Sequence, residues 1–275
     1  MDREAMLALV ERSPAAVAAQ DGEAWLSLFA QLAVIEDPVG SRPHIGGVFD
    51  ARSGRRANDA LARFYATFIE GNHIEFVRGS DHVMGNVVVR DLALQLEVAG
   101  MRATVPMHLM YELVFEDGAL KIRSLQAHWE MLPVTVQMLR SRPAGMLAYS
   151  AKLLRGLGLS GVLGFARALR SVGNGGKQRL LRFIEVANAG GSFDGMFDDA
   201  ARGVRFPGSD GWVTPAALGE LGVNMTPNKL IAAGNRVSCS LQVGQAGQAG
   251  QTRAGVAIAE FNRRSGRLDN VTLIV

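Results

Sequence analysis

The sequence is poor in cysteine, with Cys239 the single one among 275 residues, and its five histidines are scattered along the chain. One cysteine excludes an intrachain disulfide, and no group of cysteines and histidines has the spacing of a zinc site. We therefore expect no bound metal. This cysteine usage fits a reducing compartment, and residues 1–12 mix charged with apolar residues in a way unlike a secretory signal. The sequence thus predicts a cytoplasmic protein.

Long hydrophobic runs and a strong charge of one sign are also missing. The longest uncharged run in the most apolar helical stretch has 11 residues, 156–166, whereas a membrane span needs ~20. The net charge is −6 in residues 1–130, +6 in residues 131–175 and +3 in residues 176–275. No part combines a large basic surface with interleaved aromatic residues, so we do not expect nucleic-acid binding.

What is present is a composition typical of a globular protein, 48% hydrophobic and 20% charged, and a helical pattern at its start. Apolar residues recur every three or four positions between residues 6 and 29, which predicts helices. Ser13-Pro14 predicts either a break between two helices or a Ser cap followed by Pro at the first helical position. Asp21-Gly22 predicts a second corner, and a further helix is expected over residues 58–70.

Residues 73–131 alternate in the manner of strands joined by Gly turns. The four predicted strands occupy residues 73–85, 86–100, 101–118 and 119–131. Glu116-Asp117-Gly118 is a strong hairpin signal. Helices followed by a long antiparallel meander predict an α+β fold, in which the helices pack on one face of a curved sheet.

The last hundred residues repeat this order of helices and strands in shorter form. VFEDGALKIRSL at residues 114–125 matches FNRRSGRLDNVTLI at residues 261–274, each a hairpin turn followed by a strand. VRFPGSDGW at residues 204–212 likewise stands where VIEDPVGSRP stands in the first copy. The sequence therefore predicts two tandem α+β units.

The two units are expected to span residues 1–131 and 176–275, joined by a basic, apolar helical connector over residues 132–175. Three roles are open for this connector. It packs its apolar side on one or both units, it covers the mouth of a cavity, or it touches anionic lipid through residues 140–170.

The stretch VIEDPVGSRP, residues 34–43, carries the main functional signal. Asp before Pro commonly begins a turn, because Pro pushes the preceding residue into extended geometry. Alternatively, one carboxylate is a proton carrier at the mouth of an apolar cavity. Glu36 is expected to point to the opposite face from Asp37, into solvent.

VIEDPVGSRP resembles the segment around the catalytic aspartate of bacterial Δ5-3-ketosteroid isomerases, members of the nuclear transport factor 2-like (SnoaL-like) superfamily of cone-shaped α+β proteins. AAVAAQDGEAWLSLF and RANDALARFYATFI resemble the family's helices. The resemblance covers residues 1–130 well and the second copy only as fold. It implies two cone-shaped units with sheet-to-sheet pairing, within the chain or in a homodimer, and an isomerase that needs no cofactor and acts on a hydrophobic small molecule.

The resemblance assigns Asp37 as the base that moves a proton between two carbons of a steroid ketone, while two donors hold the enolate oxygen. Ser13 stands where the family has its first-helix tyrosine. Tyr65 matches a tyrosine of the family's third helix, which in many members supports the first-helix tyrosine that is replaced by Ser13 here. The implied catalytic residues therefore include Asp37 and Tyr65.

The family's second donor is an aspartic acid on a late strand, and TVPMHLMYELVF, the corresponding strand here, has none. Counting from the two ends of this strand places either Tyr111 or His108 at the position. Tyr111 is preferred because it shares strand parity with Phe115 in an apolar face, and its phenol can donate to an oxyanion. The expected substrate contacts are Trp25, His108, Phe115 and Trp129.

The second unit has Phe206-Pro207 where the first has Asp37-Pro38, so only the first is expected to carry the proton shuttle. Three functions stay open for it. It is an isomerase of an apolar fused-ring ketone, a non-catalytic binder of a hydrophobic small molecule, or another acid–base enzyme of the same superfamily such as a cyclase or dehydratase. Ser13 in place of tyrosine favours the binder, because loss of an oxyanion donor costs about 10² to 10³ in rate.

Overall fold

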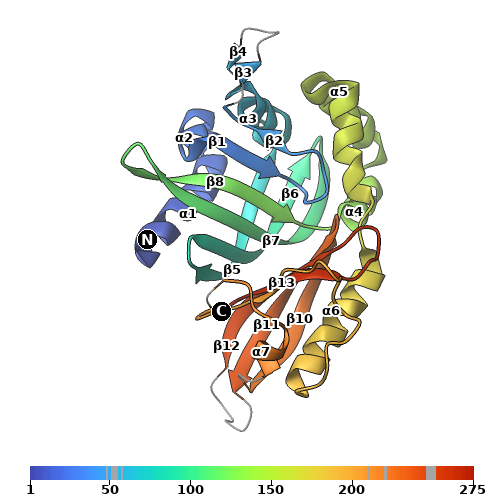
Figure 1. The fold of residues 1–275 in the computed structure, drawn as a ribbon. Coiled ribbons are helices and arrows are strands. Elements are labelled where there is room, and N and C mark those ends of the chain that lie inside the picture. Colours follow the sequence, from blue (N-terminus) through green and yellow to red (C-terminus); the bar gives the residue numbers. More distant parts are fainter. Residues whose placement is uncertain (48, 51–54, 57, 210, 220–221, 246–251) are drawn as a thin grey trace. The chain divides into compact units, whose positions relative to one another are not determined.

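The computed structural model describes residues 1–47, 49–50, 55–56, 58–209, 211–219, 222–245 and 252–275. The chain divides into two compact units. The first comprises Met1–Asp81 and Gly85–Arg170, and the second comprises His82–Met84 and Ser171–Val275. Each combines a sheet with helices, which confirms the predicted α+β class (Figure 1).

The first unit begins with helices, whose bounds are α1 Arg3–Ala18, α2 Gly22–Ser27, α3 Asn58–Phe64 and the π-helix η1 Tyr65–Ile69. Two aspartates cap the first two helices, because a side-chain oxygen satisfies an N–H that has no partner within the helix. Asp2 accepts from the Ala5 N–H at 2.9 Å, and Asp21 accepts from the Ala24 N–H at 2.9 Å. The predicted corner at Asp21-Gly22 is therefore present.

Helix α1 runs without interruption through Ser13 and Pro14, so the predicted break or cap at this pair is wrong. Pro14 has no N–H with which to reach the carbonyl of Val10 one turn earlier. Arg90 on the sheet donates to that carbonyl instead, with 3.3 Å between Nη1 and O. A bond from the sheet thus takes the place of the missing bond of the helix.

The sheet of the first unit has the strand order β2-β1-β8-β7-β6-β5. The strands are β1 Phe29–Glu36, β2 His44–Ile45, β5 His73–Met84, β6 Val87–Val98, β7 Met101–Glu116 and β8 Ala119–His128. The strands β5 to β8 are the predicted meander. Strand β1 pairs in parallel with β8, and a small separate hairpin is formed by β3 Phe49–Asp50 and β4 Arg55–Arg56.

The helices after β8 belong to the first unit; they are α4 Met131–Ser141, α5 Pro143–Ala166 and the 3₁₀ helix η2 Arg167–Leu169. Helix α5 is interrupted at Gly158, whose φ of 67° is outside the helical region. Glycines let it approach the rest of the unit: a Cβ on Gly145 would lie 2.6 Å from Met101 Cγ, and one on Gly156 would lie 2.3 Å from Thr67 Oγ1. No helix in the described part of the chain has the length and hydrophobicity needed to cross a membrane.

The second unit repeats the sheet of the first. Its elements are α6 Gly173–Asn188, β9 Gly203–Arg205, α7 Ala216–Gly219, β10 Val223–Ala233, β11 Arg236–Gln245, β12 Arg253–Phe261 and β13 Leu268–Ile274. The order β10-β11-β12-β13-β9, with β9 parallel to β13, reproduces β5-β6-β7-β8-β1. The prediction of two tandem copies is therefore confirmed by topology.

Candidate active site

A cavity of about 150 Å³ lies inside the first unit. All four strands of the meander contribute apolar side chains to its wall, among them Phe76, Leu94, Leu109 and Leu125. Helices α4 and α5 contribute another part of the wall, with Met138 and Phe165 among their side chains. The helices after β8 are therefore part of the cavity and not only a connection.

Asp37 directly follows β1 and is the one carboxylate among the described residues that line the cavity. Its Oδ1 accepts a hydrogen bond of 2.6 Å from the indole Nε1 of Trp129, the residue that follows β8. Burial raises the pKa of Asp37 to about 6, and the bond from Trp129 opposes this rise. A carboxyl with such a pKa is largely ionised at neutral pH and is a stronger base than an exposed aspartate.

The turn after β1 is stabilised by hydrogen bonds that do not involve the carboxylate of Asp37. Glu36 is half-buried, and its Oε1 accepts from the Gly40 N–H at 2.8 Å. This corrects the expectation of a solvated Glu36. The Val39 N–H donates to Ala127 O at 2.9 Å, which fixes the turn to β8. Of the two adjacent acids, Glu36 stabilises the turn and Asp37 faces the cavity.

Tyr111 lies on β7 and also lines the cavity, with 1% of its surface exposed. Its hydroxyl forms a hydrogen bond with Ser13 of α1, and the Oγ of Ser13 accepts from Trp25 Nε1 at 3.2 Å. Burial raises the pKa of Tyr111 to about 12, while the positive charge of Arg90 and the bond with Ser13 act in the opposite direction. Tyr111 therefore keeps its proton at neutral pH.

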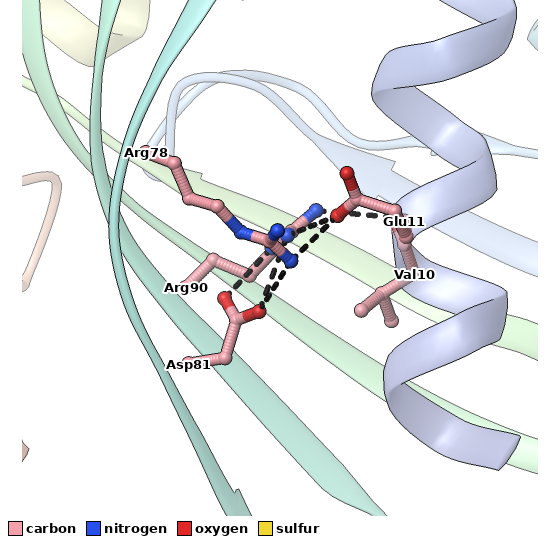
Figure 2. A network of polar contacts seen from close by, with 5 residues as sticks. All are labelled: Val10, Glu11, Arg78, Asp81 and Arg90. Carbon is pink, nitrogen blue, oxygen red and sulfur yellow. Dashed lines mark hydrogen bonds and ion pairs between the residues drawn. The ribbon is translucent and has the colours of Figure 1, made fainter. Parts of the chain in front are cut away.

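A network of charged side chains joins α1 to the sheet (Figure 2). Arg90 on β6 is 3% exposed, and its Nε lies 2.8 Å from Asp81 Oδ1 on β5. A second guanidinium nitrogen of Arg90 bonds to Glu11 on α1, and Arg78 Nη2 lies 2.8 Å from the same Glu11 carboxylate. Since Arg90 also reaches the carbonyl of Val10, the buried charge is fully paired.

Tyr149 on α5 is the residue of the site that sequence reasoning missed, because it lies beyond the 130 residues that the family resemblance covers. Its side chain lines the cavity together with Asp37. Burial raises the pKa of Tyr149, and the charge of Asp37 raises it further. Gly145 and Gly156 stand four residues before it and seven after it, so the three share the helix face that approaches the unit. That spacing shows which face of α5 is the inner one, but not that α5 packs on the first unit.

Three predicted site residues lie outside the cavity wall. Tyr65 packs on Trp25, with ring centroids 5.5 Å apart, and its hydroxyl is buried with no hydrogen-bond partner among the described residues. His108 is fully buried on β7, at the parity opposite to the cavity-lining Leu109, and its Nε2 lies 3.8 Å from Asp91 Oδ2. Neither Tyr65 nor His108 lines the cavity, so the predictions that Tyr65 is catalytic and that His108 contacts the substrate are not supported by their positions.

Phe115 is also corrected by the structure. It shares parity with Tyr111 and Leu113, which are each 1% exposed, but it is 64% exposed itself. Phe115 lies at the next-to-last position of β7, near the end of the β7–β8 hairpin, where parity alone does not ensure burial. The other predicted site residues do line the cavity. They are Asp37, Trp25, Trp129 and Tyr111.

Comparison with known proteins finds no matching family model and no matching curated protein. Solved structures do match. A Δ5-3-ketosteroid isomerase from Mycobacterium sp. is 29% identical over 46% of this chain and 93% of its own, with a TM-score of 0.37. A Mycobacterium tuberculosis protein in complex with estradiol-17β-hemisuccinate is 25% identical over 46% and 94%, with a TM-score of 0.37. An LEH-like epoxide hydrolase from M. tuberculosis is 18% identical over 53% and 97%, with a TM-score of 0.40.

The first unit combines N-terminal helices, a meander of four strands and a parallel β1 beside β8. This order of helices and strands is the one that the resemblance to nuclear transport factor 2-like proteins implied. In this sheet, Asp37 is the residue that follows β1, and Phe206 is the residue that follows the equivalent β9 of the second unit. Phe206 packs against the hydrophobic core of the second unit. The candidate base therefore belongs to the first unit alone.

Metal-ligating side chains are not clustered in the described part of the chain. Among the residues that the structure describes, no group of three His, Cys, Asp or Glu side chains is placed to hold a metal ion. The other side chains with polar groups that line the cavity are two tryptophans, two tyrosines, Ser13 and Thr135. This set of one carboxylate and several neutral donors is suited to proton transfer.

Proposed function

We propose that the first unit is a proton-transfer isomerase that shifts a C=C bond in an apolar fused-ring ketone. The observation that carries the proposal is Asp37, a single carboxylate of pKa about 6 in the wall of an otherwise apolar cavity. The choice of a fused-ring ketone follows the resemblance of VIEDPVGSRP to the base segment of ketosteroid isomerases.

The reaction uses one proton and no other reactant. The ionised carboxylate of Asp37 takes a proton from the carbon between the carbonyl and the C=C bond, and the electron pair of that C–H bond moves to form a dienolate. Protonated Asp37 then returns the proton to the far carbon of the dienolate, which yields the conjugated enone. A base that remains close to both carbons performs both transfers.

The dienolate oxygen carries negative charge, and neutral hydroxyl donors stabilise it best when they are fixed in advance. Tyr111 is fixed by its bond with Ser13 and polarised by the positive charge of Arg90. Tyr149 supplies a second hydroxyl, close enough to Asp37 for the carboxylate charge to raise its pKa. In the proposed mechanism these two tyrosines replace the family's first-helix tyrosine, whose position Ser13 occupies.

The size of the cavity bears on how a substrate enters. Its volume of about 150 Å³ is below the ~300–1,000 Å³ of typical sites for drug-sized ligands, so a fused-ring ketone requires part of the wall to move outward. Helices α4 and α5 are suited to this, because α5 is interrupted at Gly158 and is joined to α4 through Arg142, whose backbone is extended.

The test is incubation of the full chain with a Δ5-3-ketosteroid while the absorbance of the conjugated enone is followed. We expect the wild type to turn over the ketosteroid. In Asp37→Asn, kcat should fall by at least about 10³-fold, because asparagine has the shape of aspartate but cannot act as the base. Asp117→Asn, at the exposed tip of the β7–β8 hairpin, is the matched control and should keep the wild-type rate. Equal rates in wild type and Asp37→Asn would refute the proposal.

A non-catalytic binder is the second candidate, and the environment of Tyr111 favours it: the hydroxyl is already engaged with Ser13. Tyr111→Phe and Tyr149→Phe separate the two functions. An isomerase loses about 10- to 10³-fold of kcat in one or both variants, while a binder shows no turnover in the wild type and an equilibrium affinity for the steroid that both variants largely retain.

A further inference from the structure

Exposed leucines are concentrated on the outer side of the helices that follow β8. Of the twelve large hydrophobic side chains that are exposed in the described part of the chain, seven lie between residues 132 and 169. They are Leu132, Leu139, Leu147, Leu154, Leu159, Leu163 and Leu169, and they are 47–79% exposed. We name them the leucine face.

The fold does not need the leucine face. Helix α5 already packs on the first unit through its inner side, where Gly145 and Gly156 make close approaches and Tyr149 lines the cavity. Leu147, Ala151 and Leu154 follow one another at spacings of four and three residues, which places them on one stripe of the helix. An exposed apolar stripe on a helix that is already packed marks an interaction surface.

The charges around the leucine face are of one sign. Residues 131–175 contain no aspartate or glutamate. Their exposed cations are Arg140, Arg142, Arg155, Arg167 and Arg170. The rest of the first unit is acidic, with a net charge of −6 over residues 1–130, so the basic character is confined to the segment that exposes the leucines.

We propose that the leucine face and its arginines dock on an anionic membrane surface. Leucine side chains enter the boundary between headgroups and acyl chains, while arginines bind the lipid phosphates. A second copy of this chain fits less well, because a symmetric contact would bring two sets of arginines together with no acid between them. Docking at the surface requires no membrane-spanning helix.

The position of this surface suits an apolar ligand. The outer sides of α4 and α5 carry the leucines, and their inner sides line the cavity with Met138, Tyr149 and Phe165. An apolar molecule that is dissolved in a bilayer would therefore meet α4 and α5, which form part of the cavity wall, first. The docking proposal itself rests on exposure and charge, and it does not depend on the reaction assigned to Asp37.

The experiment is co-sedimentation of the full chain, without any substrate, with vesicles of equal parts phosphatidylglycerol and phosphatidylcholine. We expect binding to these vesicles, little binding to phosphatidylcholine alone, and weaker binding at high salt because the arginine–phosphate attraction is screened. Removing two arginines in Arg155→Gln/Arg167→Gln should weaken partitioning about fivefold for each charge. Lack of binding to the anionic vesicles would overturn the proposal.

Apolar insertion is tested separately with Leu147→Gln/Leu163→Gln, which should lose at least about tenfold of the partitioning. The control is Leu32→Gln, on β1, where an equally exposed leucine lies outside the leucine face. Unchanged binding of the double variant would contradict the proposal. A second outcome would also contradict the proposal. If the wild type forms a dimer and does not bind vesicles, and the double variant is monomeric, the leucine face binds a second copy of this chain.

Discussion

The indole nitrogen of Trp129 donates to the carboxylate of Asp37 across 2.6 Å, in the wall of an apolar cavity. Two opposing effects therefore act on one acid. Burial destabilises the charged carboxylate, and the indole N–H stabilises it. Trp129, predicted as an aromatic wall residue, is also the group that limits how far the pKa of the base rises.

Replacing Trp129 by phenylalanine removes the donor and keeps an aromatic ring in the wall. The pKa of Asp37, now about 6, should rise, because only the bond from Trp129 holds it down. The acid limb of the pH profile of kcat/KM then moves to higher pH. Trp212→Phe, in the second unit, should leave that limb in place. An acid limb in Trp129→Phe that coincides with the wild type would contradict this role of the indole.

Asp37→Asn should stabilise the protein at neutral pH, because a buried carboxylate must ionise there. Its pKa rises from 3.8 to about 6 on folding. Below pH 4 the group is protonated in both states, so the variant gains nothing. Between pH 4 and 6 the unfolded state loses the proton first, and the wild type loses stability until the difference reaches about 3 kcal/mol above pH 6.

Urea unfolding of the wild type and Asp37→Asn at pH 4 and pH 7 measures this difference. The gain in free energy of unfolding should be present at pH 7 and nearly absent at pH 4. The same gain at both pH values would mean that packing, and not ionisation, distinguishes the two side chains.

Arg90→Met should be strongly destabilising. The arginine side chain is 4% exposed and pairs with Asp81 and Glu11, so its removal leaves the 13% exposed Asp81 with Arg78 alone, at 3.1 Å, among the described cations. Breaking such a pair costs about 3–5 kcal/mol. Arg182→Met is the matched control: this arginine is 69% exposed and pairs with Glu185 at 3.3 Å, so its loss should cost less than about 1 kcal/mol. Equal costs in urea unfolding would argue against a structural role for the network.

Gly145→Ala tests how closely α5 must approach the unit. A Cβ there would lie 2.8 Å from the backbone oxygen of Ala99 and 2.6 Å from Met101, so the variant should lower the free energy of unfolding despite the better helix propensity of alanine. Gly175→Ala in α6 meets open space and should raise the free energy by up to about 1 kcal/mol. A stabilising Gly145→Ala would show that α5 is free to shift outward without cost.

The sequence predicted most of the strands because the alternation over residues 73–131 is regular and glycine turns separate the runs. The resemblance of VIEDPVGSRP to the base segment of ketosteroid isomerases pointed to Asp37, which lines the cavity. The repeat was visible in element order, and the parallel pairing of β9 with β13 confirms it. These features depend on residues close together in the chain.

The remaining features depend on residues far apart in the chain. Pro14 stays inside a helix because Arg90, 76 positions later, supplies the missing bond. Tyr149 reaches the cavity because α5 folds back on the first unit, which no local pattern of α5 specifies. Such outcomes are set by tertiary contacts, which override local propensity.

The bond from Arg90 to the carbonyl of Val10 makes the stability of α1 conditional. Pro14 deprives the isolated helix of one bond and costs it roughly 3 kcal/mol of helix propensity, so residues 3–18 on their own are a poor helix. The deficit is offset only when β6 has brought the guanidinium of Arg90 into place. Formation of α1 and formation of the sheet are thus coupled in one cooperative step, and Ser13, at the middle of that helix, reaches its place beside Tyr111 only in the folded unit.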